Sequence, residues 1–308
     1  MTAPRIAVVG CGYLGAVHAA GMASLGLETV GIDVDEAKVA ALGAGRSPFF
    51  EPGLDAMLRE GLDAGALRFA TDATGVDADV WFVCVGTPQR PGSDAADMTY
   101  VDAAVDALLP HLREGMLVVG KSTVPVGTAE RLAALVEGTG ARLAWNPEFL
   151  REGLAVTDTL APDRLVYGVR DGDDAAVAAL DAVYASILER GTPRIVTDFA
   201  TAELVKVSAN AFLATKISFI NAMAEVAEAS GADVVQLADA IGIDARIGRR
   251  FLNSGIGFGG GCLPKDIRAF RARSIEVGAE DALGFLDEVD RVNQRRRDRM
   301  VALVEREL

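Results

Sequence analysis

Short apolar runs alternate with longer segments of helical spacing along the first 150 positions of the chain. Five runs are typical of buried strands, at residues 5–9, 28–32, 80–85, 117–120 and 142–144. The segments between them repeat apolar residues with the period of a helix, beginning with the one that runs to about residue 25. Strands that alternate with helices in this way predict an α/β fold with a doubly wound parallel sheet.

The pattern changes after residue 196. From 197 to 231 no strong helix breaker occurs and apolar residues recur at helical spacing, which predicts one long helix. A shorter helix over 234–241, a glycine-rich loop at 255–261 and two further helical segments follow. We therefore expect two domains, 1–196 and 197–308. The helix is too long to be covered by one small domain, so we expect it to bridge domains or to pack against a second copy of itself, with a homodimer as the preferred interpretation.

The charge argues against a nucleic-acid partner, because 44 acidic and 30 basic residues give a net charge of −14. The densest basic run is Arg295, Arg296, Arg297 and Arg299, interrupted by Asp298. A solvated helix face is the main interpretation of this run, and a small anionic ligand is the alternative.

The sequence also bears on location. It shows neither a secretory signal nor an apolar run of the ~20 residues that span a bilayer, so we expect no membrane association. The three cysteines, Cys11, Cys84 and Cys262, lie far apart and indicate neither a disulfide framework nor a metal site. We expect a cytoplasmic protein.

A glycine turn links the first predicted strand to its helix. Gly10, Gly12 and Gly15 form the pattern G-x-G-x-x-G, in which the glycines permit a tight turn, a close approach of pyrophosphate and close packing of helix on strand. Asp33 ends the second predicted strand, where a carboxylate can bind an adenosine ribose and repel a 2′-phosphate. The sequence therefore favours NAD over NADP, with a flavin as the rival cofactor.

Residues 146–153 have the start and stop signals of a short helix. Asn146 is an N-cap type, Pro147 suits the first helical position and Gly153 suits the end. On such a turn Glu148 and Glu152 share a face. Taken alone, acidic residues near a helix start are more often partners of the helix dipole than catalytic groups.

Two polar residues interrupt the apolar long helix. Lys206 and Asn210 are four residues apart and share a face. The lysine can extend to solvent, or lie in a cleft with a polar or anionic partner.

Cys262 directly follows the glycine-rich loop. Glycines at such density favour a backbone that approaches a ligand closely. Lys265 is near enough in sequence to favour a thiolate, and Asp266 can position water or a base. We interpret Cys262 as a nucleophile, although a lone cysteine is more often an inert apolar residue.

Together these motifs resemble the UDP-glucose/GDP-mannose dehydrogenase family, in its order and spacing over the whole chain. The resemblance rests on Asp33 and Lys38 with residues 10–15, and on segments 85–88, 122–125, 146–153, 206–210, 246–248 and 257–266. It implies a Rossmann-like NAD-binding domain followed by an α-helical dimerisation domain.

The activity implied by this resemblance is a four-electron oxidation of UDP-glucose to UDP-glucuronate, for polysaccharide biosynthesis, using two NAD. By this resemblance, Cys262 would add to the aldehyde, a second hydride loss would leave a thioester, and water would hydrolyse it with Glu148 handling the proton. Lys206 and Asp266 would stabilise the oxyanion or relay the alcohol proton, and Asn210 would hold the sugar or the oxyanion.

The resemblance also implies binding residues. Those for NAD are Gly10, Cys11, Gly12, Tyr13, Leu14, Gly15, Asp33, Lys38, Thr87, Pro88, Ser122, Thr123 and Glu152. Those for the nucleotide sugar are Glu148, Phe149, Leu150, Arg151, Glu152, Lys206, Asn210, Arg246, Asn253, Gly257, Phe258 and Gly259. No metal is implied.

Alternatives stay open at this point. GDP-mannose or another nucleotide sugar is a second substrate, a two-electron hydroxyacid dehydrogenase is an enzyme rival, and a catalytically silent NAD-binding dimer is a rival of another class. Family members usually continue into a further domain that holds the uridine diphosphate. We therefore expect residues 1–308 alone to bind NAD and to turn over UDP-glucose poorly.

Overall fold

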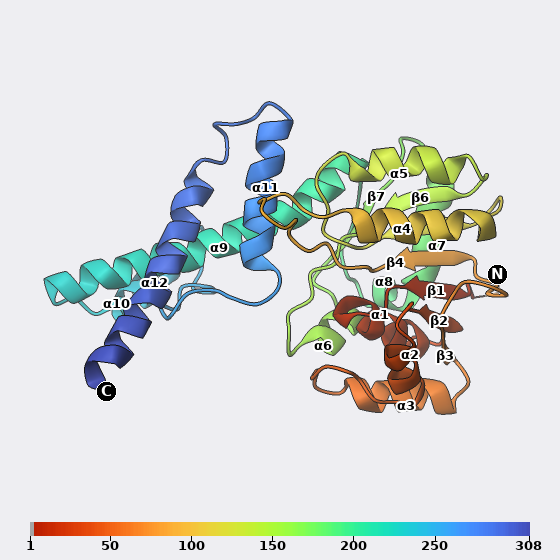
Figure 1. The fold of residues 1–308 in the computed structure, drawn as a ribbon, viewed down its shortest axis with the longest axis horizontal. Helices are drawn as coiled ribbons and strands as arrows, with labels where there is room; N and C mark the ends of the chain where they lie inside the picture. The colour runs from red at the N-terminus through yellow and green to blue at the C-terminus, as the bar shows by residue number, and fades with distance from the viewer. Residues whose placement is uncertain (1–2) are drawn as a thin grey trace. The chain divides into compact units, whose positions relative to one another are not determined.

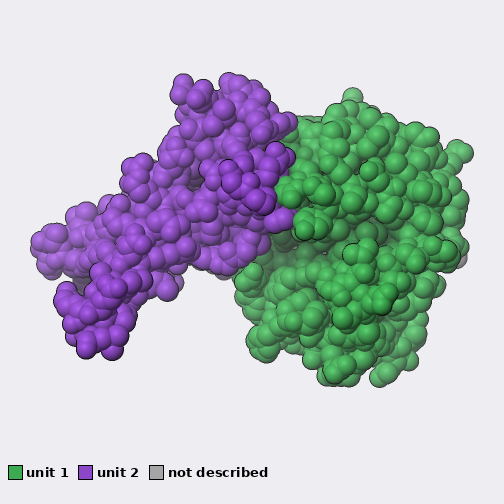
Figure 2. All heavy atoms as spheres, in the orientation of Figure 1, with its two compact units in different colours: residues 1–87, 97–206 green, residues 88–96, 207–308 purple. Residues whose placement is uncertain are grey.

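The computed structural model describes residues 3–308, which divide into two compact units (Figures 1 and 2). Unit 1 comprises residues up to 87 together with 97–206, and unit 2 comprises 88–96 and 207–308. The long helix begins in the first unit and continues into the second. The domain boundary expected after residue 196 stays a prediction.

Unit 1 is built on an eight-stranded sheet with the order β3-β2-β1-β4-β5-β6-β7-β8. All neighbouring strands pair in parallel except β6 and β7, which are antiparallel through Trp145 and Gly168. The chain reverses its direction across the sheet between β1 and β4, and this is where a doubly wound sheet binds its ligand. The strands are β1 (Ile6–Val9), β2 (Thr29–Ile32), β3 (Leu67–Ala70), β4 (Val80–Val83), β5 (Leu117–Gly120), β6 (Arg142–Trp145), β7 (Leu165–Gly168) and β8 (Arg194–Thr197).

Helices cover both faces of this sheet (Figure 1), and the strands alternate side chains between two cores. In β1, Ile6 and Val8 enter one core and Ala7 enters the other. A strand buried on both faces is a continuous apolar run, which is why the central strands could be predicted. The helices of this unit are α1 (Tyr13–Ser24), α2 (Glu36–Gly43), α3 (Leu54–Asp63), α4 (Thr99–Leu108), the 3₁₀ turn η1 (Leu109–His111), α5 (Thr128–Glu137), α6 (Ala155–Leu160), α7 (Asp174–Val183) and α8 (Ala185–Glu189).

The predicted fold class is confirmed, and each of the five predicted strands is present. Three strands were not predicted, namely β3, β7 and β8. β3 and β8 lie at the two edges of the sheet, and each leaves part of its length exposed. Edge strands lack the continuous apolar run on which the prediction depended.

Unit 2 is helical apart from its long loops. It contains most of α9 (Phe199–Ser230), with α10 (Val234–Gly242), α11 (Leu263–Glu276) and α12 (Phe285–Glu307). All four helices were expected from their spacing. One small core joins α9, α11 and α12 and includes Ala211, Ile267 and Leu286. A second core joins α9 to α10 through Ile220 and Ala238.

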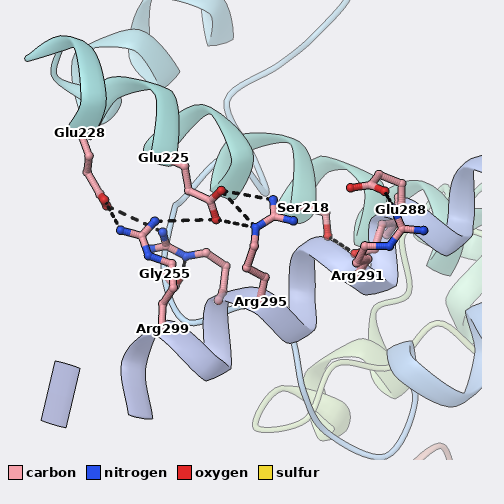
Figure 3. A network of polar contacts seen from close by, with 10 residues as sticks. Ser218, Glu225, Glu228, Gly255, Glu288, Arg291, Arg295 and Arg299 are labelled. Carbon is pink, nitrogen blue, oxygen red and sulfur yellow. Dashed lines mark hydrogen bonds and ion pairs between the residues drawn. The ribbon is translucent and has the colours of Figure 1, made fainter. Parts of the chain in front are cut away.

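Ion pairs join the C-terminal part of α9 to α12 (Figure 3). Arg295 pairs with Glu225, and Arg299 pairs with Glu228 at 2.5 Å. Arg297 instead donates to the carbonyl of Phe258. The arginine run of α12 therefore has partners within its own unit, which favours the interpretation as a helix face over an anion site.

Within residues 3–308, no helix combines the length and apolarity needed to cross a bilayer.

Candidate active site

The glycine turn between β1 and α1 has the geometry that its sequence predicts. Gly10 has φ of 88°, a conformation that side chains disfavour, and a Cβ there would lie 2.6 Å from Val85. A Cβ on Gly15 would lie 1.8 Å from the Gly10 carbonyl oxygen, so only glycine lets α1 approach the strand end this closely. A Cβ on Gly12 would meet no atom within 4 Å. The middle glycine therefore borders open space.

The N-terminus of α1 is suited to an anion. Its N-cap is Gly12, no side chain among residues 3–308 caps it, and its first turn holds no acidic residue. The first backbone N–H groups of a helix need acceptors, and the helix dipole favours negative charge there. The open space at Gly12 and these donors fit the pyrophosphate of a dinucleotide.

Asp33 lies at the end of β2 with its carboxylate almost buried. It accepts hydrogen bonds from the backbone N–H of Cys11 at 2.8 Å and from that of Asp35 at 3.0 Å. The ammonium of Lys38 lies 2.8 Å from the same carboxylate. The acid is thus fixed beside the glycine turn. The predicted pair of Asp33 and Lys38 is formed, whereas the N–H of Cys11 is already occupied by Asp33.

The loops after β4 and β5 bind to each other. The hydroxyl of Thr87 donates to the carbonyl of Thr123 at 2.7 Å, and the hydroxyl of Ser122 donates to the carbonyl of Val85 at 2.6 Å. These loops follow adjacent parallel strands, at the edge of the sheet where α/β proteins bind ligands. Pro88, predicted with them, belongs to unit 2.

The prediction of a helix over residues 146–153 is wrong. β6 ends at Trp145, an irregular segment follows, and α6 begins only at Ala155. Asn146 caps no helix, and Glu148 and Glu152 do not share a helical face. The local signals were overridden because a buried lysine binds the Asn146 side chain.

That lysine is Lys121, which sequence reasoning missed. Its ammonium donates to Oδ1 of Asn146 at 2.9 Å, and the hydroxyl of Tyr184 donates to the same atom at 2.7 Å. The Asn146 amide in turn donates to the Val166 carbonyl. Burial lowers the pKa of Lys121 to about 8. Lys121 could have been found in the sequence as a charged residue directly after a predicted apolar strand.

Glu148 and Lys206 form a largely buried ion pair. One carboxylate oxygen of Glu148 lies 3.0 Å from the Lys206 ammonium, and the other accepts from the N–H of Leu150 at 2.6 Å. The Lys206 side chain is only 7% exposed, so of the two predicted environments the lysine has the one with an anionic partner. Two cations lie over the ring of Phe149, whose centre is 5.6 Å from the Lys206 nitrogen and 3.8 Å from the guanidinium carbon of Arg164. The site thus holds an acid and a base in contact.

The rest of this segment is tied down by acidic residues. Arg151 pairs with Asp158, and Glu152 is exposed. Glu51, another residue that sequence reasoning missed, accepts from the N–H groups of Gly153 and Ala155, each at 2.8 Å. It also accepts from the hydroxyl of Tyr13, beside the glycine turn. The sequence gives Glu51 no distinctive spacing by which it could have been found.

In unit 2, the predicted residues of α9 and α11 meet. The Asn210 amide donates to Oδ2 of Asp266 at 2.7 Å, and Lys265 lies 2.5 Å from Oδ1 of the same carboxylate. The charge of Lys265 is therefore directed at Asp266. Cys262 precedes α11 and is exposed. Cys11 and Cys84 are buried, and burial raises the pKa of both thiols, so Cys262 is the better placed for chemistry.

The remaining predicted substrate residues lie on the segment between α10 and α11. Arg246 is exposed and bonds to Asp244 on its own turn, and Asn253 accepts from Arg249 at 2.8 Å. Gly257 and Gly259 flank Phe258, whose side chain is buried in the core shared by α9, α11 and α12.

Residues 4–188 match the NAD binding domain of the UDP-glucose/GDP-mannose dehydrogenase family, and residues 200–295 match its central domain. The chain belongs to this family. NAD is the cofactor of the matched domain, as the glycine turn and Asp33 predicted.

Individual relatives agree. A UDP-glucose 6-dehydrogenase of Rhizobium meliloti is 43% identical over 86% of the chain and 62% of its own length. Among solved structures, a UDP-glucose dehydrogenase from Pyrobaculum islandicum has a TM-score of 0.88 at 42% identity, over 95% of this chain and 68% of that one. A GDP-mannose dehydrogenase from Pseudomonas aeruginosa has a TM-score of 0.74 at 32% identity, over 98% of this chain and 71% of that one. The chain thus spans less than two thirds of the first relative.

Proposed function

We propose that the protein is an NAD-dependent nucleotide-sugar dehydrogenase that oxidises UDP-glucose to UDP-glucuronate, with Cys262 as the covalent nucleophile. The observation that carries the proposal is the pairing along α9. Lys206 is bound to Glu148, and Asn210, one helical turn further, is bound to Asp266. Both pairs combine an acceptor with a donor, as proton transfer and oxyanion stabilisation require.

The proposed reaction oxidises the primary alcohol of the sugar in two steps, each of which removes one hydride. The primary alcohol loses a hydride and a proton to give an aldehyde, and the thiol of Cys262 adds to the carbonyl carbon. Loss of a second hydride leaves a thioester, and water then breaks the carbon–sulfur bond to release the carboxylate and restore the thiol. NAD, which the glycine turn before α1 and Asp33 would hold, would supply the hydride acceptor for each of the two oxidations.

The charged residues have distinct roles in this proposal. Asp266, fixed by Asn210 and Lys265, relays the proton of the alcohol. Lys206 balances the negative charge of the oxyanion. Glu148 accepts a proton from the hydrolytic water, and its bond to the N–H of Leu150 keeps its second oxygen oriented.

A second nucleotide sugar remains an alternative substrate. The 32% identity to a GDP-mannose dehydrogenase, over 98% of this chain, supports it. The higher identity to two UDP-glucose dehydrogenases favours UDP-glucose. Initial rates with both sugars, at equal concentration and saturating NAD, distinguish the two.

The decisive experiment counts NADH per sugar and weighs the intact protein. Even at the low turnover expected of residues 1–308, wild-type protein should form two NADH per UDP-glucose oxidised. Cys262→Ala should stop carboxylate formation while still binding the nucleotide sugar, because only the nucleophile is lost. Glu148→Gln should slow hydrolysis, so that a thioester adduct accumulates in the mass spectrum.

Cys84→Ala is the matched control, because this buried thiol has no place in the proposed reaction. It should keep a stoichiometry of two. Two NADH per sugar from Cys262→Ala would contradict the covalent mechanism, and a stoichiometry of one in the wild type would favour a two-electron dehydrogenase.

A further inference from the structure

The segment between α10 and α11, residues 243–262, forms no helix or strand, yet polar side chains of α9 and α12 hold its backbone. It contains the glycine-rich loop 255–261. Loop backbone without regular structure needs other partners for its N–H and C=O groups. The identity of these partners shows which residues determine the shape of the loop.

Asn293 of α12 binds the peptide groups of Phe258 twice. Its Oδ1 accepts from the N–H of Phe258 at 2.7 Å, and its Nδ2 donates to the carbonyl of Phe258 at 3.0 Å. The side chain is 1% exposed, so losing either bond would leave a buried polar group unsatisfied. A carboxamide supplies an acceptor and a donor at this spacing, which few other side chains can do.

Gly257 is fitted to this contact. Its φ of 101° lies in the region that side chains disfavour. A Cβ at this position would lie 2.2 Å from Oδ1 of Asn293 and 3.1 Å from its Cγ. Glycine is therefore required at 257 both by the backbone conformation and by the Asn293 amide.

The Phe258 ring is buried as well. It lies in the core formed by α9, α11 and α12, with Ala211 and Ile267. Ala211 directly follows Asn210, and Ile267 directly follows Asp266. The loop is therefore held by the same core that holds this proposed catalytic pair.

Further bonds fix the neighbouring peptide groups. The N–H of Gly255 donates to Oδ1 of Asn221 at 2.8 Å, and Arg296 donates to the Gly255 carbonyl at 3.0 Å. Figure 3 shows Gly255 beside the ion pairs of α9 and α12. Arg297 adds a second donor to the Phe258 carbonyl at 2.6 Å. Asn293 alone among these side chains binds both polar groups of one residue.

We propose that Asn293 is a positioning residue for the nucleotide sugar. By holding the peptide groups of Phe258, it keeps the glycine-rich loop in one conformation before the substrate binds. The inference rests on the proposed function, in which this loop contacts the substrate. Asn293 itself is buried on α12 and touches the loop, and its role is to reduce the ordering cost of binding.

The test compares Asn293→Ala, Asn293→Asp and Gln294→Ala. Gln294 is the next residue on α12 and is a matched control, since its side chain makes no hydrogen bond to the loop among residues 3–308. Two readouts are needed: amide hydrogen exchange of peptides covering 255–262, and steady-state kinetics with UDP-glucose and NAD. Dissociation constants for NAD measured by calorimetry complete the set.

We expect Asn293→Ala to speed exchange at Phe258 at least tenfold and to raise KM for the sugar about tenfold or more, with the affinity for NAD unchanged. Asn293→Asp keeps the acceptor for the Phe258 N–H, so it should restore exchange and KM to within about threefold of wild type. Gln294→Ala should match wild type. If Asn293→Ala fails to fold, Asn293→Asp decides, since it should fold with a smaller rise in both quantities.

A double-mutant comparison adds a sharper criterion. Gly257→Ala disrupts the same contact from the loop side, so its effect on KM should not add to that of Asn293→Ala. Additive effects, unchanged exchange at Phe258, or faster exchange with an unchanged KM would each overturn the inference. Absence of any nucleotide-sugar oxidation by the wild type would instead contradict the proposed function, and unchanged exchange at Phe258 in Asn293→Ala would still overturn the inference on its own.

Discussion

Lys121 is a buried cation, and no acidic side chain among residues 3–308 lies within hydrogen-bond distance of its ammonium group. It binds Asn146 and Tyr184, and its nitrogen lies 5.7 Å from the centre of the Phe82 ring. Neutral dipoles and ring faces compensate burial of a charge less fully than a carboxylate does. This is why burial lowers its pKa from 10.5 to about 8.

The lowered pKa predicts a pH-dependent stability. Below pH 8 both folded and unfolded chains carry the proton, and the fold bears the full cost of the buried charge. Between about 8 and 10.5 the unfolded chain binds more protons, so this contribution makes stability rise with pH. The rise should reach roughly 3 kcal/mol relative to Lys121→Met. Urea unfolding of both proteins at pH 7.5 and 10 measures it, and parallel profiles would contradict it.

Asp33 predicts the choice of cofactor. A 2′-phosphate brought to this carboxylate would be repelled, so NAD should bind at least about tenfold tighter than NADP, or about 1.4 kcal/mol. In Asp33→Ala the ammonium of Lys38 loses its partner, so the preference should shift towards NADP. Titration calorimetry with both dinucleotides measures the preference. Asp35→Ala is the control, because it leaves the pair of Asp33 and Lys38 in place, and equal affinities in the wild type would remove the role given to Asp33.

At the scale of elements, the glycines of the turn between β1 and α1 have separable tasks. Gly15 lets the helix pack against the strand end, whereas Gly12 borders open space. A sequence motif records both as glycine, and the structure distinguishes packing from ligand binding.

This difference predicts opposite phenotypes. Gly15→Ala should lower the free energy of unfolding by about 1–3 kcal/mol, because its Cβ would overlap the Gly10 carbonyl. Gly12→Ala should change stability by less than about 0.5 kcal/mol. It should still weaken NAD binding at least about tenfold, because the methyl group enters the space proposed for the pyrophosphate. Thermal melts with and without NAD measure both effects, and a stable Gly15→Ala would refute the packing role.

At the scale of the whole molecule, α9 carries an exposed apolar stripe. Phe212, Phe219 and Val226 are seven residues apart and are 66%, 48% and 58% exposed. Residues at this spacing lie along one face of a helix. Such an apolar face supports the proposal that α9 pairs with α9 of a second copy.

We therefore predict a homodimer at micromolar concentration. Phe219→Glu should produce a monomer, because a charge in the centre of an apolar interface cannot be desolvated cheaply. Leu135→Glu, an exposed leucine on α5, is the matched control and should leave the mass unchanged. Light scattering measures both, and a monomeric wild type would contradict the prediction.

Local sequence determined much of this protein. The strands β1, β2, β4, β5 and β6 and the four helices of unit 2 could be predicted, because burial on both faces gives continuous apolar runs and amphipathic helices repeat every 3.6 residues. The inner strand β7 is equally buried and was nevertheless missed. The glycine turn and Asp33 predicted NAD because each acts through its own backbone or its place at a strand end. Cys262 could be proposed as a nucleophile because the glycine-rich loop directly precedes it.

The tertiary structure alone decided the residues whose roles depend on distant partners. Residues 146–153 have the signals of a helix, yet the segment is irregular, and Lys121, 25 positions earlier, binds the Asn146 side chain that would otherwise be free to cap a helix. Glu51 and Asn293 likewise hold backbone 102 and 35 positions away. Periodicity and capping signals extend over a few residues, whereas burial of a polar group selects whichever partner the fold brings near.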